Sequence, residues 1–278
     1  MRGRCPRCGA VDSSPGSSYV LAMRRMLLTL PDARCPFGCQ YCFAEFSQYE
    51  RPLDLDAVER SPDLLADVDV VYPACDVDLF ATKTPLEILR RTAALGRSIS
   101  VSTKAALSDR LVRGLADIAR DIEERGEILK VGVSISTKHN CGRLEPRAAT
   151  YALRIRNLRL LQAASIPSAL VLKPVLRDVS LGEYCEIISD AEPFTRLVLV
   201  GDEYLDALEP RVPLAAVTRR RVPWAINQPI WPVTTDVERI ASIKAFAERL
   251  GFCVFESDLE LMAALAQIRI DEQSLSPV

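Results

Sequence analysis

Stretches typical of strands and of helices alternate along the middle of the chain. Between Met26 and Val200, short runs rich in valine, isoleucine and leucine are followed by longer stretches with a helical spacing of apolar residues. This alternation predicts parallel strands joined by crossover helices. About six strands can be counted, which is too few for a closed barrel of eight. The predicted fold class is therefore α/β: a partial (β/α)6 TIM-like barrel with a short C-terminal α/β extension.

The sequence suggests three segments. Residues 1–25 form an N-terminal segment with a C-x2-C pair, residues 26–204 form the barrel, and residues 205–278 form the extension. The extension opens with irregular, proline-rich sequence and ends in sequence with helical character. Capping-box patterns, in which a serine or threonine is followed three residues later by glutamate, predict helix starts at Thr84, Thr235 and Ser257.

The composition of the chain limits the compartment and the kinds of partner that we expect for it. Its 278 residues fit one large domain or two small ones, and its net charge of −2 at pH 7 gives no overall attraction to nucleic acid. The sequence shows neither a secretory signal nor an apolar stretch long enough to span a membrane. A cytoplasmic protein without membrane partners is expected. In that setting, its nine cysteines are expected to be metal ligands or reduced thiols.

Three cysteines stand close together in the run CPFGCQYCF. Cys35, Cys39 and Cys42 have the spacing C-x3-C-x2-C, with Tyr41 directly before the last cysteine. Three thiolates can bind three irons of a 4Fe–4S cluster and leave the fourth iron open to a ligand that is not protein. Structural zinc sites instead use two separated pairs of ligands, which fits this run poorly. Buried free cysteines are the remaining alternative.

The cysteine pattern resembles that of the radical S-adenosylmethionine (SAM) superfamily. The resemblance implies that the amino and carboxylate groups of SAM occupy the open iron of the 4Fe–4S cluster. It also implies that the reduced cluster cleaves SAM to a 5′-deoxyadenosyl radical, which abstracts hydrogen from a substrate. A reductant such as flavodoxin or ferredoxin is then an expected partner.

Other segments resemble one branch of that superfamily, the spore photoproduct lyases and DNA repair photolyase-like proteins. These segments follow one another in the same order as in that branch: Ser102-Thr103-Lys104, Val133-Ser134-Ile135-Ser136, Leu144-Glu145-Pro146-Arg147, the arginine-led helix from Arg154, and Ile166-Pro167. The resemblance implies that Lys104 contacts the SAM carboxylate and that Ser134 also touches SAM. Ser136 alternates with Ser134 onto the same face of the strand, so either serine could serve.

Cys75 follows the second expected strand, in the run Pro73-Ala74-Cys75-Asp76-Val77-Asp78. Spore photoproduct lyases have a cysteine followed by an acidic residue in this neighbourhood, and it donates a hydrogen atom to the product radical. The resemblance therefore implies a catalytic role for Cys75, with a buried structural cysteine as the alternative. Asp76 and Asp78 are alternatives for binding SAM hydroxyls or a substrate cation.

The N-terminal pair Cys5 and Cys8 supplies half of a zinc site. His139 and Cys141 could complete a zinc site if the N-terminus folds over the loop that follows the fourth strand. A second cluster and a pair of free thiols are the other interpretations of Cys5 and Cys8.

Three functions agree with these patterns. The first is a radical SAM lyase acting on damaged DNA, for which the Arg219–Arg221 run would have to supply phosphate contacts. The second is a biosynthetic radical SAM enzyme acting on a small molecule, nucleoside or peptide, because fold and cofactor do not settle the substrate. The third is a non-catalytic iron–sulfur sensor, which binding of SAM would argue against.

Overall fold

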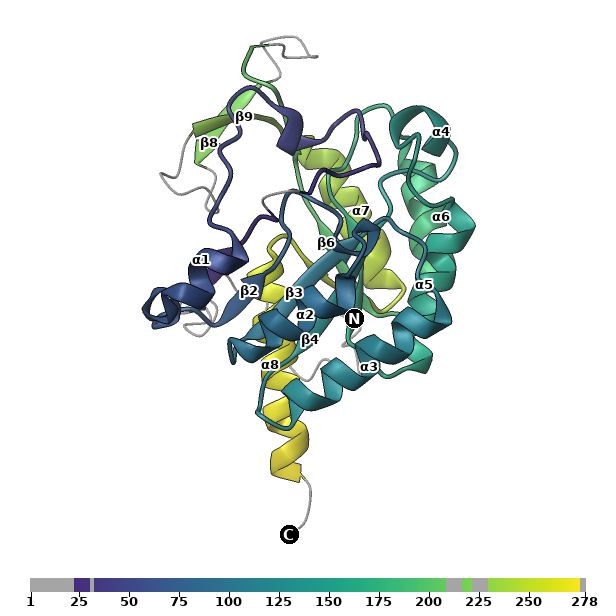
Figure 1. The fold of residues 1–278 in the computed structure, drawn as a ribbon. Helices are drawn as coiled ribbons and strands as arrows, with labels where there is room; N and C mark the ends of the chain where they lie inside the picture. Colours follow the sequence, from purple (N-terminus) through teal and green to yellow (C-terminus); the bar gives the residue numbers. More distant parts are fainter. Residues whose placement is uncertain (1–22, 31–32, 209–216, 222–229, 276–278) are drawn as a thin grey trace.

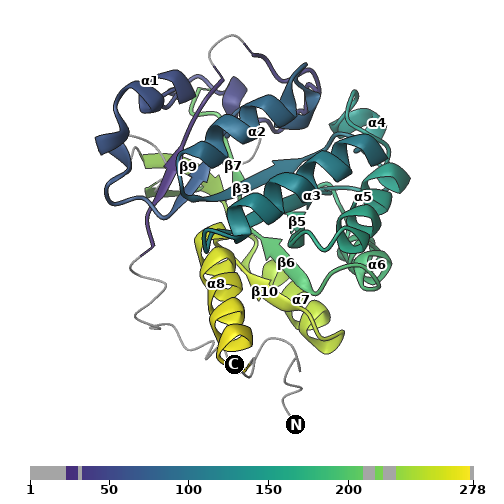
Figure 2. The ribbon, with the colours of Figure 1, turned by 60° about the horizontal axis from the view of Figure 1, so that its bottom comes forward.

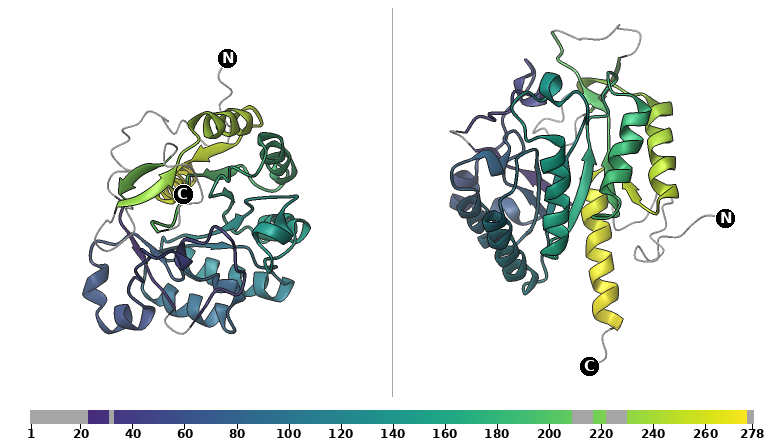
Figure 3. Two further views of the ribbon diagram at one scale, coloured as in Figure 1. Left: turned by 90° about the horizontal axis from the view of Figure 1, so that it is seen from above. Right: turned by 90° about the vertical axis from the view of Figure 1, so that its right-hand side faces the viewer.

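A curled sheet of seven parallel strands forms the centre of the molecule (Figures 1 and 3). The structure is a computed structural model, and it describes residues 23–30, 33–208, 217–221 and 230–275. The strands lie in the order β1-β2-β3-β4-β5-β6-β10. Their bounds are Arg25–Leu27, Val70–Tyr72, Ser98–Thr103, Leu129–Ser134, Ser168–Leu172, Leu197–Val200 and Cys253–Phe255. All six pairings are parallel, which confirms the predicted partial α/β barrel.

Crossover helices cover the convex face of this half-barrel (Figures 1 and 2). The long ones are α2 (Pro85–Ala94), α3 (Asp109–Glu123), α5 (Tyr151–Ala163), α6 (Leu181–Ala191) and α7 (Val237–Arg249). The short helices α1 (Leu55–Arg60) and α4 (Cys141–Leu144) lie within connecting segments. The α7–β10 unit comes from the C-terminal part of the chain and continues the alternation, so that β10 becomes the seventh strand beside β6.

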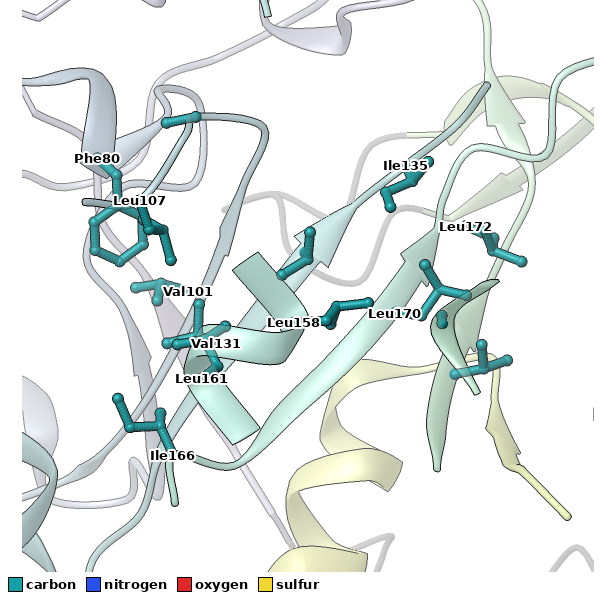
Figure 4. Close-up of a cluster of buried hydrophobic side chains, with 14 of the residues drawn as sticks. Phe80, Val101, Leu107, Val131, Ile135, Leu158, Leu161, Ile166, Leu170 and Leu172 are labelled. Carbon is teal, nitrogen blue, oxygen red and sulfur yellow. The ribbon is translucent and has the colours of Figure 1, made fainter. Parts of the chain in front are cut away.

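Alternation along the strands sends one set of side chains outward and the other inward. Val101, Val131 and Leu170 point outward into the main hydrophobic core, where Leu158 and Leu161 of α5 pack on them (Figure 4). These five side chains are 4% exposed or less. Burying each stabilises the fold by about 1.5–3 kcal/mol, so this outer layer fixes which residues face the concave side.

The concave face is lined by the alternate residues and is partly filled by the last helix. Helix α8 (Asp258–Leu275) places Leu261 against Ala169, Val171 and Leu199. Figure 3 shows this helix within the curl of the sheet when the molecule is seen from above. No helix among the described residues is long and apolar enough to cross a membrane.

A small antiparallel sheet lies at the carboxyl ends of the barrel strands (Figure 1). It contains β7 (Glu203–Tyr204), β9 (Ile230–Thr234) and β8 (Thr218–Arg221) in that order. Trp231 of β9 is 1% exposed and its ring contacts the rings of Phe43, Phe46, Tyr49 and Tyr204. These contacts hold the extension against the segment that follows the third cysteine of the loop.

Candidate cluster and cofactor site

The cysteine loop follows β1 directly, at the carboxyl edge of the sheet. Cys35, Cys39 and Cys42 are free and partly exposed, and the amide of Cys42 donates to the carbonyl of Cys39 at 3.1 Å. Gly38, between the first two cysteines, has a φ of +60°, a conformation that glycine adopts without strain. This turn folds the loop back so that the thiols lie on one short segment.

A distant segment supports the loop from outside. The amide of Gln40 donates to the carbonyl of Leu144 at 3.0 Å, and the amide of Arg147 donates to the carbonyl of Phe37 at 3.3 Å. The Arg147 guanidinium donates to the carbonyl of Pro36 and lies directly over Gly38, where a Cβ would stand 2.5 Å from one of its nitrogens. A larger side chain at this position would displace the end of the flexible Arg147 side chain from the loop.

The three thiols suit a cluster by their chemistry. Burial raises the pKa of Cys39 to about 11 and also raises that of Cys42, and the neighbouring thiols raise both further. Thiolates that repel one another when they have no metal are stabilised by binding cationic iron. Among the described residues, no group of three or more histidine, cysteine or acidic side chains is placed to hold a single metal ion. A 4Fe–4S cluster does not require this, since each thiolate binds a different iron.

Lys104 and Ser134 meet at the ends of neighbouring strands. Thr103 and Val133 are paired in register, so the residues that follow them lie side by side. The ammonium of Lys104 donates to the hydroxyl of Ser134 at 2.8 Å. It also lies 5.5 Å from the centre of the Tyr41 ring, and its charge lowers the pKa of Cys39 against the effect of burial. The structure thus brings the lysine and serine together beside the cysteine loop.

Glu145 is the centre of a buried network that the sequence motifs did not assign a role. The carboxylate is 1% exposed, accepts from the phenol of Tyr41 and pairs with Arg154 at 2.6 Å. Arg154 is itself fully buried and donates to the carbonyl of Ser134 at 2.9 Å. Lys104 lies 4.0 Å from the same carboxylate. The network therefore joins the cysteine loop, the lysine and the serine into one support.

Ser136 lies deeper than Ser134. It is fully buried, and its hydroxyl has no hydrogen-bond partner among the described residues. Burial and the carboxylate of Glu145 raise the pKa of the nearby Tyr41 phenol. Of the two serines, Ser134 is the one whose hydroxyl the ammonium of Lys104 reaches.

Cys75 occupies the loop after β2, and its amide donates to the carbonyl of Leu28 at 3.0 Å. Its sulfur lies 3.8 Å from the hydroxyl of Tyr49. Burial, reinforced by the charge of Asp76, raises the pKa of Cys75 to about 12. The group therefore remains a thiol with its hydrogen attached at neutral pH.

The two aspartates after Cys75 are occupied with structural bonds. Asp76 accepts from the hydroxyl of Thr29 at 2.7 Å and pairs with Arg51 at 3.5 Å. Asp78 accepts from the hydroxyl of Thr103 at 2.9 Å and from the amide of Lys104 at 2.6 Å. Burial raises the pKa of Asp78, and these bonds offset part of that effect.

A polar cavity of about 480 Å³ opens between the cysteine loop and the loop of Cys75. It is lined by Ala33, Arg34, Cys35, Ala44, Glu45, Arg51, Asp76 and Val77. The cavity gives a small molecule access to the first cysteine of the loop.

The residues considered for a zinc site are otherwise engaged. Cys5 and Cys8 lie outside the described residues. His139 is exposed, with its Nε2 3.4 Å from a carboxylate oxygen of Glu186, and the sulfur of Cys141 lies 3.2 Å from the guanidinium of Arg154. Neither side chain is directed at the other, and the described residues give no support for a zinc site there.

Comparison with known proteins gives matches in structure. No protein-family model matches the chain, and neither does any protein of curated function. A cysteine-to-serine variant of spore photoproduct lyase is 15% identical with a TM-score of 0.61, over 88% of this chain and 79% of that one. Spore photoproduct lyase complexed with dinucleoside spore photoproduct is 15% identical with a TM-score of 0.56, over 81% and 75%.

SuiB of Streptococcus suis, bound to S-adenosylmethionine, is 11% identical with a TM-score of 0.57, over 86% of this chain and 52% of that one. Spore photoproduct lyase and SuiB are both radical SAM enzymes, so the fold is the one expected from the cysteine motif. The predicted resemblance to that superfamily, and to its spore photoproduct lyase branch, is confirmed at the level of the fold.

Proposed function

We propose that the chain is a radical SAM enzyme. Cys35, Cys39 and Cys42 would hold a 4Fe–4S cluster with one open iron, at which SAM would bind. When bound, the reduced cluster supplies the electron that cleaves SAM to a 5′-deoxyadenosyl radical, and a flavodoxin or ferredoxin is the proposed source of that electron. One observation carries the proposal: three free thiols of one loop lie beside a lysine–serine pair at the strand ends.

The residues around the loop would position SAM. The ammonium of Lys104 offers a positive point charge to the SAM carboxylate, and Ser134 holds that ammonium in place. Glu145 and Arg154 fix the serine carbonyl and Tyr41, so the lysine and the cysteine loop keep one arrangement. Ser136, two residues beyond Ser134 toward the carboxyl edge, would lie beside Tyr41.

Cys75 is proposed as the donor of a hydrogen atom to the product radical. Its raised pKa keeps the S–H bond intact, and Tyr49 is close enough to exchange hydrogen with it.

The proposed substrate is a damaged DNA base, and the activity a lyase activity like that of spore photoproduct lyase, which binds a dinucleoside lesion. The net charge of −2 favours the second candidate, a biosynthetic reaction on a small molecule, nucleoside or peptide. Anaerobically reconstituted protein with SAM, dithionite and ultraviolet-irradiated DNA separates the two. A rise in 5′-deoxyadenosine over the DNA-free background, with restored thymine, supports the lyase. Formation that irradiated DNA leaves unchanged favours the second candidate.

Lys104→Ala is expected to weaken SAM binding about tenfold or more, because a hydrogen bond to a charged group contributes about 1.5–3 kcal/mol. Equilibrium binding of labelled SAM to the reconstituted protein measures the effect. Lys83→Ala is the matched control, since Lys83 is exposed on the loop before α2. Equal SAM affinity in wild type and Lys104→Ala would remove Lys104 from the site.

Cys75→Ala is expected to leave SAM cleavage intact and to change the product, because the product radical then lacks its hydrogen donor. Chromatography of the products formed from irradiated DNA, or from any substrate found to raise 5′-deoxyadenosine formation, detects the change. Cys185→Ala, on the partly exposed surface of α6, is the control. An unaltered product from Cys75→Ala would show that Cys75 donates no hydrogen.

A further inference from the structure

A row of polar side chains crosses the concave face below the proposed SAM contacts. Ser100 of β3 is paired in register with Lys130 of β4. Tyr72 of β2 follows Val71, which is paired with Ile99, so Tyr72 lies level with Ser100. Because Ile99 and Val71 pack outward, these three polar residues face the inside of the curl. They stand two layers below Lys104 and Ser134.

Small residues occupy the layer between this row and the proposed SAM contacts. Gly132 is paired in register with Ser102 on one side and with Ala169 on the other. A Cβ at Gly132 would lie 2.7 Å from the hydroxyl of Ser102 and 2.7 Å from a methyl group of Val171. Ser102 is nevertheless exposed to solvent. A ligand entering from the carboxyl edge can therefore reach down to Ser102.

Two hydroxyls of the polar row are unsatisfied hydrogen-bonding groups. The hydroxyl oxygens of Tyr72 and Ser100 are buried and have no hydrogen-bond partner among the described residues. A buried polar group without a partner loses the hydrogen bonds that water would give it, which is unfavourable. Two such groups on neighbouring strands favour a ligand or water that accepts hydrogen bonds from both.

Lys130, Asp258 and Arg25 together carry a net charge of +1 beside the polar row. Lys130 and Asp258 are buried and pair at 2.5 Å, so their charges cancel. Arg25 of β1 lies on the same face, since its neighbour Met26 packs outward. The side chain of Arg25 forms no hydrogen bond or ion pair with another described residue. Burial lowers the pKa of Arg25 and the carboxylate of Asp258 raises it, and the sulfur of Cys75 is also within electrostatic range of the guanidinium.

We propose that the concave face binds an oxyanion of the substrate, a phosphate or a carboxylate, with Arg25 as its charge partner and the hydroxyls of Ser102, Tyr72 and Ser100 as donors. An arginine suits this task because its planar guanidinium binds such groups through two parallel hydrogen bonds. The inference rests on the proposed function and adds a substrate class to it: a molecule with an acidic group that is held at Arg25 while its reacting carbon lies near Cys75.

Equilibrium dialysis of the full-length, anaerobically reconstituted protein with labelled inorganic phosphate and with labelled acetate tests the site. Chloride keeps the ionic strength constant. The wild type is expected to bind one equivalent of at least one probe, and the probe that binds better identifies the acidic group. Arg25→Gln is expected to weaken that binding about tenfold or more. Arg110→Gln, an exposed arginine on α3, is the matched control and is expected to bind as the wild type does.

Ser102→Asp gives a second and independent variant, because it places a negative charge on the exposed part of the concave face. It is expected to weaken anion binding as strongly as Arg25→Gln does. If Arg25→Gln does not fold, Ser102→Asp still tests whether the anion binds on this face. Wild-type protein without saturable binding of either probe, or a folded Arg25→Gln variant with wild-type affinity, would overturn the proposal.

Background 5′-deoxyadenosine formation, measured with SAM and dithionite but without substrate, tests the proposed function separately from the anion site. It is measured in the wild type and in the matched control Arg110→Gln, both of which are expected to form 5′-deoxyadenosine and to bind the anion. If the wild type forms no 5′-deoxyadenosine while Arg25→Gln and Ser102→Asp lose the anion, the anion site stands and the radical SAM assignment fails.

Discussion

Cys39→Ala is expected to abolish stable cluster binding. Cys39 is the middle ligand of the loop, and its loss leaves two thiolates for four irons. Iron and sulfide content per chain after anaerobic reconstitution, together with the spectrum of the reduced cluster, measure the effect. We expect wild type to approach four irons per chain, the content of one 4Fe–4S cluster, and the variant to retain only a small fraction.

Cys185→Ala is the matched control for the cluster, since it removes a free thiol from α6 without touching the loop. It is expected to bind iron as the wild type does. Full iron content in Cys39→Ala, or equal losses in both variants, would contradict the assignment of the three cysteines as cluster ligands.

Asp258→Asn is expected to lower the free energy of unfolding by about 3–5 kcal/mol, because it removes one partner of a buried ion pair. Lys130 is fully buried and its ammonium donates to Asp258 at 2.5 Å. Burial lowers the pKa of Lys130 and raises that of Asp258, so each group depends on the other to stay charged. Urea unfolding followed by circular dichroism measures the loss.

The double variant Lys130→Met/Asp258→Leu is the control for this pair. Replacing both charges with apolar groups of similar size removes the uncompensated charge, so most of the lost stability should return. A single variant as stable as the wild type would show that the pair does not hold α8 against the half-barrel.

Local sequence patterns predicted the alternation of strands and helices well, and the helix caps less well. The Ser257 box forms, with Glu260 accepting from the amide of Ser257 at 3.2 Å. Thr84 precedes α2 as predicted but makes no side-chain cap. At α7 the cap is Asp236 and not Thr235, because its carboxylate reaches the amide of Arg239 at 3.0 Å. Where a threonine precedes an aspartate, the local sequence does not decide which of the two side chains caps the helix, and tertiary packing decides it.

The candidate site likewise contains parts that local sequence patterns predicted and parts that they did not. The cysteine loop and the Lys104–Ser134 pair could be predicted because each depends on short motifs at strand ends. The contact of Tyr41 with Glu145 joins residues 104 positions apart, and that of Lys130 with Asp258 joins residues 128 apart. No local pattern specifies which buried carboxylate meets which cation. The same reason hides the place of β10 beside β6, which depends on the fold of the intervening residues.

The most direct measurement is 5′-deoxyadenosine formation by the anaerobically reconstituted protein with SAM and dithionite, with Cys39→Ala treated in parallel. We expect 5′-deoxyadenosine from the wild type and none above the reagent background from the variant. A wild-type protein that carries an intact, reducible cluster and forms no 5′-deoxyadenosine would contradict the radical SAM assignment and favour an iron–sulfur sensor.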